Sequence, residues 1–472
     1  MSIGLERLTE QAHREIEQLD YPRRDWMPAR SAPDGTSIYD VIIVGAGQGG
    51  LAAAFGLMRE RIRNILVLDE NPLGRAGPWL NFARMPTLRT PKHVLGPDLG
   101  VPSLTPRAWF EAQHGEGSWG GLGLLPKEDW AAYLNWYRVT LSLPVQADTR
   151  VGALRYRADL RAFEVPCEPV GARAGSASQT LLARRVVLAT GIEGSGEWTV
   201  PAMITDALPR AQYAHTRWDI DFEALRGKRI AVLGAGASAF DNASTALERG
   251  AGEVRLFFRR KQLVNVNPYR WAEFAGFLGH HGDMPDADRY RFIHQILRMG
   301  QLPPTDTYHR ATRLPSFHLQ PGAGWRSLER RGDNVVIHTD AGDFETDFVI
   351  AATGFVTDLS KRAELTELCS QIALWRDRYS PPAGERNEDL ERHPYLGPHF
   401  ELTERTPGAA PHLAHVYNYT FGCLLSLGFG GASISGMKYS IQRLVRGITG
   451  SLFCEDRDHH FATLRAFDER EF

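Results

Sequence analysis

A glycine-rich turn near the start of this chain has the composition and spacing that phosphate binding requires. An apolar run that begins at Tyr39 opens into the pattern GxGxxG at Gly45, Gly47 and Gly50. The first glycine permits a tight turn, the second lets backbone approach a pyrophosphate, and the third lets a helix pack closely on the strand. The start of that helix offers free N–H groups and a positive dipole end to a phosphate. The turn therefore predicts a dinucleotide site.

An acidic residue follows this turn where a ribose would lie. The apolar run that starts at Ile65 ends in Asp69. A carboxylate about 20 residues beyond such a turn binds ribose hydroxyls, and its charge disfavours a 2′-phosphate. Strand, turn, helix, strand and acid thus occur in the order that this kind of site needs.

The pattern occurs a second time, with a different ending. The second turn has the form GxGxxA at Gly234, Gly236 and Ala239, and the strand that follows it ends in Arg259 and Arg260. An arginine at this position can pair with a 2′-phosphate, so we expect NADPH there, with NADH as the alternative. A solvated turn is the other interpretation of the two arginines.

The two segments that begin with these glycine-rich turns also end in the same way. An apolar strand ends in Thr190-Gly191 in the first unit, and another ends in Thr353-Gly354 in the second. Glycine at such a position lets the backbone lie close to a bound nucleotide. The repeated layout predicts that one chain binds two dinucleotides.

Composition excludes several other classes of protein. The 472 residues contain 54 Lys and Arg against 56 Asp and Glu, a net charge of −2, which gives no basic surface for nucleic acid. The four cysteines are far apart in the sequence, which argues against a disulfide framework, a zinc cluster or a redox dithiol. The pair His280-His281 lacks ligand spacing, so we expect no metal. With no signal-peptide core or membrane-length apolar stretch, we expect a cytoplasmic protein.

At this point the chain resembles the class B flavin-dependent monooxygenases: flavin-containing monooxygenases, Baeyer–Villiger enzymes and microbial N-hydroxylases. The resemblance covers most of the chain. It rests on Gly45–Gly50, Gly77–Trp79, Thr90–Lys92 with Asp98, Gly234–Ala239 with Asp241, and Phe348–Gly354. It implies FAD on the first unit and NAD(P)H on the second. It also implies insertion of one oxygen atom of O₂ into a small organic substrate through a C4a-(hydro)peroxyflavin.

The expected fold is α/β, with two Rossmann-like dinucleotide-binding domains, the second inserted into the first. The expected segments are an N-terminal helix and linker (1–37), the FAD domain (38–200 and 354–472) and the NAD(P)H domain (201–353). Two long loops, 96–125 and 262–325, are expected to set the substrate. We expect a small molecule and O₂ as partners, no nucleic acid or membrane, and allow for a homo-oligomer.

The resemblance also suggests site residues. Trp79 belongs to a segment similar to the GGxW motif of the family, and His215 to a segment similar to its linker fingerprint. Arg89 stands where flavin-containing monooxygenases have a flavin-facing Asn. Arg89 or Lys92 could steady an anionic peroxide or hold an anionic substrate; pairing with FAD phosphate or nearby carboxylates is the alternative.

A glycine-rich run near the C-terminus is similar to a segment that closes over the flavin ring in related flavoproteins. It contains Gly430 and Gly431 and leads into a helix expected to run to about Ile448. A helix start stabilises the negative charge of reduced flavin. The alternative is a loop of small residues that packs between the domains.

These motifs are compatible with several reactions. The Arg-x-Pro form at Arg89 is closer to the amine N-hydroxylases, so N-hydroxylation of an amine or amino acid comes first. Baeyer–Villiger or sulfide oxygenation, and hydroxylation of an electron-rich heteroaromatic such as urate, are the alternatives. An NAD(P)H-dependent electron-transfer reductase is a rival of another class, and a nucleotide-sensing protein without catalysis is a third.

Overall fold

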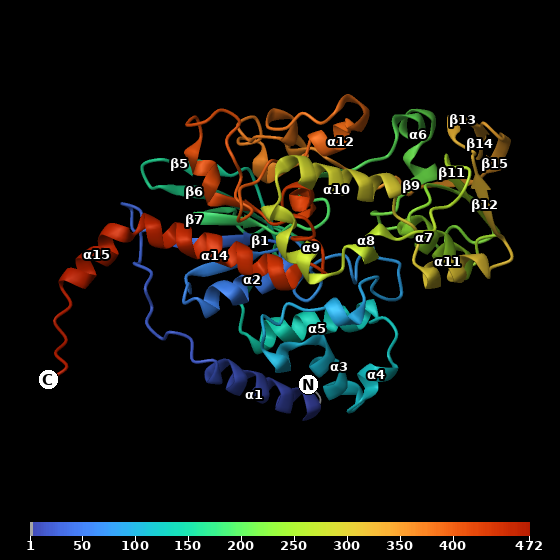
Figure 1. The fold of residues 1–472 in the computed structure, drawn as a ribbon. Coiled ribbons are helices and arrows are strands. Elements are labelled where there is room, and N and C mark those ends of the chain that lie inside the picture. The colour runs from blue at the N-terminus through green and yellow to red at the C-terminus, as the bar shows by residue number, and fades with distance from the viewer. Residues whose placement is uncertain (1–2) are drawn as a thin grey trace.

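Two large β-sheets, the first mixed and the second parallel, organise the chain, of which the computed structural model describes residues 3–472 (Figure 1). The first sheet has the order β3-β2-β1-β7-β6-β4, with β5 beside β6 and β18 beside β7. Its strands are β1 (Ile38–Val44), β2 (Ile65–Leu68), β3 (Val145–Gln146), β4 (Thr149–Val151), β5 (Arg155–Arg157), β6 (Ala162–Pro169), β7 (Gln179–Leu188) and β18 (Val416–Asn418).

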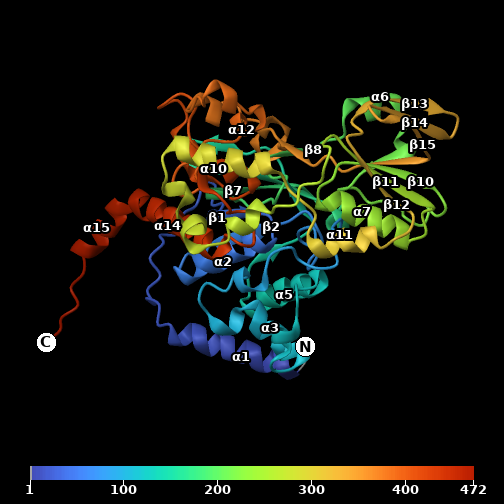
Figure 2. The ribbon, with the colours of Figure 1, turned by 45° about the vertical axis from the view of Figure 1, so that its right-hand side comes forward.

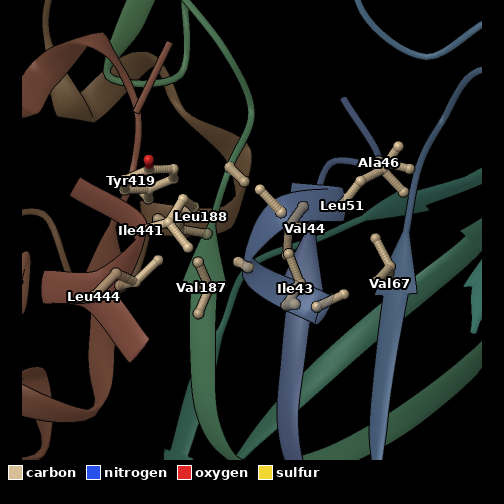
Figure 3. Close-up of a cluster of buried hydrophobic side chains, with 14 of the residues drawn as sticks. Ile43, Val44, Ala46, Leu51, Val67, Val187, Leu188, Tyr419, Ile441 and Leu444 are labelled. Atoms are coloured by element: carbon tan, nitrogen blue, oxygen red, sulfur yellow. The ribbon is translucent and has the colours of Figure 1, made fainter. Parts of the chain in front are cut away.

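The central strand β1 is apolar and buried on both faces, as a strand inside a parallel sheet must be. In register, Ile43 pairs with Val67 of β2 on one side and with Val187 of β7 on the other. Figure 3 shows these side chains together, with Ile441 and Leu444 approaching from another element. The core of the first domain therefore lies directly beneath the first glycine turn, which follows Val44.

Strand β7 has two different partners along one edge. Its first half pairs with β6 in antiparallel register, for example Ala183 with Phe163. Its second half pairs with β18 in parallel register, for example Val187 with Tyr417. The chain thus returns to the first sheet after completing the second, and the expected insertion of one dinucleotide-binding fold into another is confirmed.

The second sheet is parallel throughout, with the order β12-β11-β10-β16-β9. These strands are β9 (Tyr213–His215), β10 (Arg229–Leu233), β11 (Glu253–Phe258), β12 (Phe317–Pro321) and β16 (Phe348–Ala351). A separate antiparallel sheet contains β13 (Trp325–Arg331), β14 (Asn334–Thr339) and β15 (Gly342–Thr346). Figures 1 and 2 show both sheets on the same side of the molecule.

The two segments that cross between the domains pair with each other. Strand β8 (Gly196–Trp198) leaves the first domain, and β17 (Phe355–Thr357) returns to it in antiparallel register. The Thr353 hydroxyl donates to the carbonyl oxygen of Thr199 beside this pair. The crossing is therefore a short two-stranded ribbon.

Helices cover the sheets and fill the inserts. They are α1 (Ile3–Gln18), α2 (Gln48–Arg59), α3 (Pro106–His114), α4 (Ser118–Gly121), α5 (Lys127–Thr140), α6 (Ala202–Ala207), α7 (Ala237–Glu248), α8 (Pro268–Trp271), α9 (Ala275–His280), α10 (Asp286–Met299), α11 (Thr305–Thr312), α12 (Glu388–Glu391), α13 (Leu424–Leu427), α14 (Met437–Glu455) and α15 (Arg457–Arg465). No helix within 3–472 is both long and apolar enough to cross a membrane.

Helix α14 packs against α2 over the first sheet. A β-carbon on Gly56 would lie 2.6 Å from Cγ2 of Val445, so glycine permits this close approach. The helix extends to Glu455, seven residues beyond the expected end near Ile448, because Leu452 continues its buried face. Helix α15 projects away from the body in Figures 1 and 2.

The expectation of long loops in the two inserts is wrong, because both contain helices. In the first, α3 begins after Thr105, whose hydroxyl accepts the N–H of Ala108. In the second, α10 buries Tyr290, Ile293 and Ile296. These side chains pack with Trp375, Leu424 and Leu425, so an insert that the sequence places in the second domain packs on the first.

A buried ion cluster holds the far end of α14. Arg184 on β7 is 0% exposed, and its guanidinium lies 2.8 Å from Asp456 and 3.3 Å from Asp40. Arg185 lies 2.8 Å from Glu455. These charged side chains are all buried, so each needs the opposite charges beside it to offset its lost hydration.

We expect Arg184→Met to lower the free energy of unfolding by about 3–5 kcal/mol, because it leaves buried carboxylates without a partner. Arg326→Met is the matched control, since Arg326 is exposed and pairs with the exposed Asp340. Urea denaturation followed by fluorescence measures both. Equal effects of the two substitutions would contradict this account of the cluster.

Candidate functional site

A cavity of about 560 Å³ lies where the two domains meet, a size typical of ligand pockets. Its walls come from the first glycine turn, the end of β2 with the residues that follow it, the segment Gly77–Arg89 and β4. Ala189–Glu193 after β7, Lys361–Glu364, the glycine-rich run at Gly431 and α7 of the second domain complete them. Of the residues suggested by the sequence, it brings together Gly45, Gly47, Asp69, Trp79, Arg89, Thr190, Gly191 and Gly431.

The first turn has the geometry that its glycines predict. Gly45 has φ +107°, and a β-carbon there would lie 2.4 Å from the Ala189 carbonyl oxygen. A β-carbon on Gly50 would lie 1.8 Å from the carbonyl oxygen of Gly45. At Gly47, in contrast, no atom lies within 4 Å of such a β-carbon. The outer glycines allow the turn to pack, and Gly47 leaves room for a phosphate.

Asp69 lies beside this turn at the end of β2 and is buried. One carboxylate oxygen accepts the backbone N–H of Ala46 at 2.7 Å, and the other accepts that of Asn71 at 2.8 Å. Burial raises the pKa of Asp69, and these two hydrogen bonds oppose the rise. The carboxylate therefore holds the turn in place while it lines the cavity.

Two buried polar atoms at the cavity indicate that it is built for a polar ligand. The Thr190 hydroxyl and the side-chain carbonyl oxygen of Gln48 are buried and have no hydrogen-bond partner among the described residues. Both residues line the cavity. Since buried polar groups are normally hydrogen-bonded, these atoms fit a bound dinucleotide such as FAD.

The glycine-rich run reaches the cavity through Gly431 and Ala432. Gly431 has φ +54°, and a β-carbon there would lie 2.5 Å from the Thr420 carbonyl oxygen. Gly430 does not line the cavity and instead packs beside Phe400. Helix α14 begins a few residues later, at Met437, so its N-terminus lies close to this wall.

Arg89 lines the cavity and forms an ion pair across the domain junction. Its Nη2 atom donates to Oδ2 of Asp241 on α7 at 2.6 Å. The Arg89 side chain is 34% exposed and that of Asp241 is 2% exposed. Burial raises the pKa of Asp241, and the charge of Arg89 opposes the rise. The sequence is compatible with either a carboxylate partner or a substrate for Arg89, and the structure contains the carboxylate pairing.

Lys92 lies outside the cavity, contrary to the suggestion that it acts beside the flavin. Its Nζ atom donates to the carbonyl oxygens of Trp119 and Leu122 at 2.5 and 2.6 Å, and to that of Gly120 at 3.3 Å. A cation near the C-terminus of a helix satisfies carbonyl groups that have no partner within the helix. Lys92 thus secures the short helix α4.

His215 also lies outside the cavity, at the crossing between the domains. Its Nδ1 atom accepts the N–H of Arg217 at 3.1 Å, so Nε2 carries the proton and donates to the Gly354 carbonyl oxygen at 3.1 Å. Burial lowers the pKa of His215 to about 4. A neutral ring with both nitrogens engaged joins the two crossing segments and has no free position for proton transfer.

The second turn repeats the geometry of the first. Gly234 has φ +125°, and a β-carbon there would lie 2.4 Å from the carbonyl oxygen of Ala352. A β-carbon on Gly236 would have no neighbour within 4 Å, which again leaves room for a phosphate. Ala239 packs in the second core. Thr353 and Gly354 belong to the crossing rather than to the cavity.

The two arginines after β11 differ in their surroundings. Arg260 donates to the carbonyl oxygens of Arg298 and Met299 at the end of α10. Arg259 is exposed and has no ion pair or hydrogen bond among the described side chains. Of the two arginines, Arg259 is therefore the one that remains open to a ligand.

Sequence reasoning missed several residues that line the cavity. Ser238 follows Gly236 in the second turn, so the motif itself could have indicated it. Arg217 and Glu193 lie close to identified motifs, but their ion pair joins positions far apart in the sequence. Tyr419 is buried against Ser440 of α14 and belongs to no motif that would have indicated it.

We expect the neutral His215 to make stability depend on pH. Its pKa of about 4 lies below the ordinary 6.5, so the unfolded chain binds this proton more readily. The stabilisation is complete above pH 6.5 and is lost as the pH falls toward 4. Over this pH range the free energy of unfolding of His215→Gln should therefore fall by up to about 3 kcal/mol less than that of the wild type.

Urea denaturation between pH 6.5 and 4 measures this dependence. His280→Gln, at an exposed position, is the control and should keep the wild-type slope. A His215→Gln protein with the wild-type slope would contradict the assignment.

Comparison with known proteins agrees with this geometry. The family model of pyridine nucleotide-disulphide oxidoreductases matches residues 39–276. An FAD-dependent urate hydroxylase from Xanthomonas campestris is 44% identical over 471 residues, covering 100% of this chain and 98% of that protein. The four cysteines of this chain are all free, so the fold carries no redox disulfide.

Solved structures share the fold at low sequence identity. An FAD-bound cadaverine monooxygenase from Erwinia amylovora has a TM-score of 0.66 at 18% identity, covering 88% of this chain and 95% of its own. An ornithine N-hydroxylase from Kutzneria sp. 744 has a TM-score of 0.67 at 16% identity, covering 88% and 99%. The chain belongs to the pyridine nucleotide-disulphide oxidoreductase family, and along its whole length it is a relative of the FAD-dependent urate hydroxylase.

Proposed function

We propose that this enzyme hydroxylates urate, or a closely similar purine anion, with FAD, NADPH and O₂. The observation that carries the proposal is the 44% identity to a urate hydroxylase along the whole chain. The reaction would consume substrate, O₂, NADPH and a proton and release hydroxylated substrate, NADP⁺ and water. Bound FAD supplies hydride acceptance and oxygen activation, and the protein supplies binding, orientation and shelter from water.

Within this proposal, the cofactors divide between the two domains. FAD lies on residues 38–200 and 354–472, with its phosphates at Gly45, Gly47 and Gly50 and its ribose near Asp69. NADPH lies on residues 201–353, with its phosphates at Gly234 and Gly236. The open space at Gly47 and Gly236 supports these assignments.

The charges around the cavity favour an anionic substrate over an amine. Each acidic side chain that lines it already has a partner within the described residues. These are Asp69 with two backbone N–H groups, Glu70 with Arg150, Glu193 with Arg217, Asp241 with Arg89, and Glu364 with Arg362. An ammonium substrate would have to displace an arginine or a backbone N–H group to reach a carboxylate, whereas an anion can use the N–H donors that a paired guanidinium still has free.

N-hydroxylation of an amine, the first hypothesis from the sequence, has weaker support than urate hydroxylation. It rests on the Arg-x-Pro form at Arg89 and on a solved cadaverine monooxygenase and a solved ornithine N-hydroxylase that share the fold at under 20% identity. The sequence relationship that covers the whole chain is to the urate hydroxylase.

A panel of substrates decides between these reactions. Purified enzyme with FAD and NADPH is given urate, ornithine, lysine or cadaverine, while NADPH oxidation, O₂ uptake and product mass are measured. We expect urate alone to gain one oxygen atom, in step with NADPH oxidation. Hydroxylation of an amine in place of urate would overturn the proposal. Rapid reduction of an artificial acceptor without any oxygenated product would favour an electron-transfer reductase.

We expect Arg259→Ala to weaken NADPH binding and leave NADH binding nearly unchanged, because only NADPH carries the 2′-phosphate. A charge-assisted hydrogen bond of this kind corresponds to roughly a 10- to 100-fold rise in KM for NADPH. Steady-state kinetics with both coenzymes measures it. Arg260→Ala is the matched control, since that guanidinium is already bonded to the end of α10. Equal effects on the two coenzymes would contradict the assignment.

A further inference from the structure

The ion pair between Arg89 and Asp241 connects the two dinucleotide-binding domains inside the cavity. Arg89 follows the segment 77–88 of the first domain, and Asp241 lies on α7, directly after the second glycine turn. Both residues line the cavity, and their atoms Nη2 and Oδ2 are 2.6 Å apart. The pair thus joins the two domains at the wall of the cavity.

Only one edge of the Arg89 guanidinium is engaged. Its hydrogen bond to Asp241 is the sole one that the described residues provide, and it uses Nη2. An arginine has five N–H donors in a planar fork, so Nε and Nη1 remain free. Because the side chain is 34% exposed to the cavity, these donors are open to a ligand.

Asp241 is held from the other side as well. Arg310 lies 3.9 Å from its Oδ1 atom, and the Thr307 hydroxyl donates to the same oxygen at 3.5 Å. The carboxylate is 2% exposed, so it is fixed in the protein and out of reach of a ligand. It can therefore orient Arg89 while Arg89 binds something else.

Arg84 illustrates the opposite case within the same segment. Its guanidinium donates to the carbonyl oxygens of Thr216 and Trp218 at 2.9 Å each, which ties the segment to the second domain. Two arginines of one loop thus have separate tasks: Arg84 fixes the loop, and Arg89 keeps a free edge in the cavity.

We propose that Arg89 binds the substrate as a planar, charge-delocalised heteroaromatic anion, and that Asp241 is the positioning residue that aims its guanidinium. This inference rests on the proposed function and names the group that recognises the substrate class. A guanidinium fork matches two acceptors on the edge of such an anion, and a lysine ammonium cannot reproduce that geometry.

The arrangement also connects substrate binding with the coenzyme domain. Asp241 lies two positions after Ala239 on the helix that the second glycine turn begins. Any shift of α7 when NADPH binds would move the carboxylate that orients Arg89. The substrate anchor is thus completed by a residue of the other domain.

Anaerobic titration of the FAD-loaded protein with urate, followed by the visible flavin spectrum, tests the proposal. We expect Arg89→Ala to weaken urate binding roughly 10- to 100-fold. Arg89→Lys keeps the charge and loses the fork, so it should recover only part of the affinity. Asp241→Asn should weaken urate binding by a smaller factor, and added guanidinium ion should partly restore binding to Arg89→Ala alone.

Arg217→Ala is the matched control. Arg217 also lines the cavity, is likewise 34% exposed and pairs with Glu193. Its substitution should change urate binding much less than that of Arg89. A parallel titration with NADP⁺ separates substrate from coenzyme. The proposal is overturned if Arg89→Ala binds urate like the wild type, or if it loses NADP⁺ binding as strongly as urate binding.

A panel of other planar aromatic anions separates this inference from the proposed function. If the wild-type enzyme binds and oxidises no urate, the proposed function fails. Binding of another planar anion that Arg89→Ala abolishes would then still support the anchor. If Arg89→Ala binds every anion in the panel as well as the wild type does, the inference fails whatever the substrate is.

Discussion

The short ribbon between β8 and β17 fixes the geometry on which the whole site depends. Both crossings between the domains run through it, and His215 bonds the second domain to Gly354 beside it. Because the crossing is paired and its histidine is buried and neutral, the first glycine turn and the start of α7 face the same cavity in a defined arrangement. Together with the contacts of Arg84 and Arg89 to the second domain, the ribbon sets the distance between the domains at the cavity.

Local signals predicted the parts of the fold that depend on close backbone approach. The glycine turns, the apolar strands beside them and the acid at Asp69 could be read from spacing, because steric contact between near neighbours determines them. The inserts could not be read in this way. Helix α10 is stabilised by packing on Trp375 and Leu424, which are far away in the sequence, so its burial had no local signal.

The same distinction between local and long-range contacts applies to the candidate site residues. Turn residues lie where their motif predicts, but the tasks of Lys92 and His215 depend on carbonyl groups brought to them by the tertiary fold. The sequence near a motif does not show whether a basic or titratable residue faces a ligand or forms hydrogen bonds with backbone carbonyl groups. For Arg89, likewise, only the folded structure reveals the carboxylate of Asp241 from the other domain.

The return of the chain to β7 through β18 has a consequence for synthesis. Residues 213–351 contain every strand of the second sheet, so that sheet can be completed while the remainder of the chain is still on the ribosome. The first sheet lacks β18 until residue 418 has been made. Since domains generally fold as units, the inserted domain is free to fold before the domain that surrounds it is finished. In this enzyme, the part that begins first at the N-terminus is completed last.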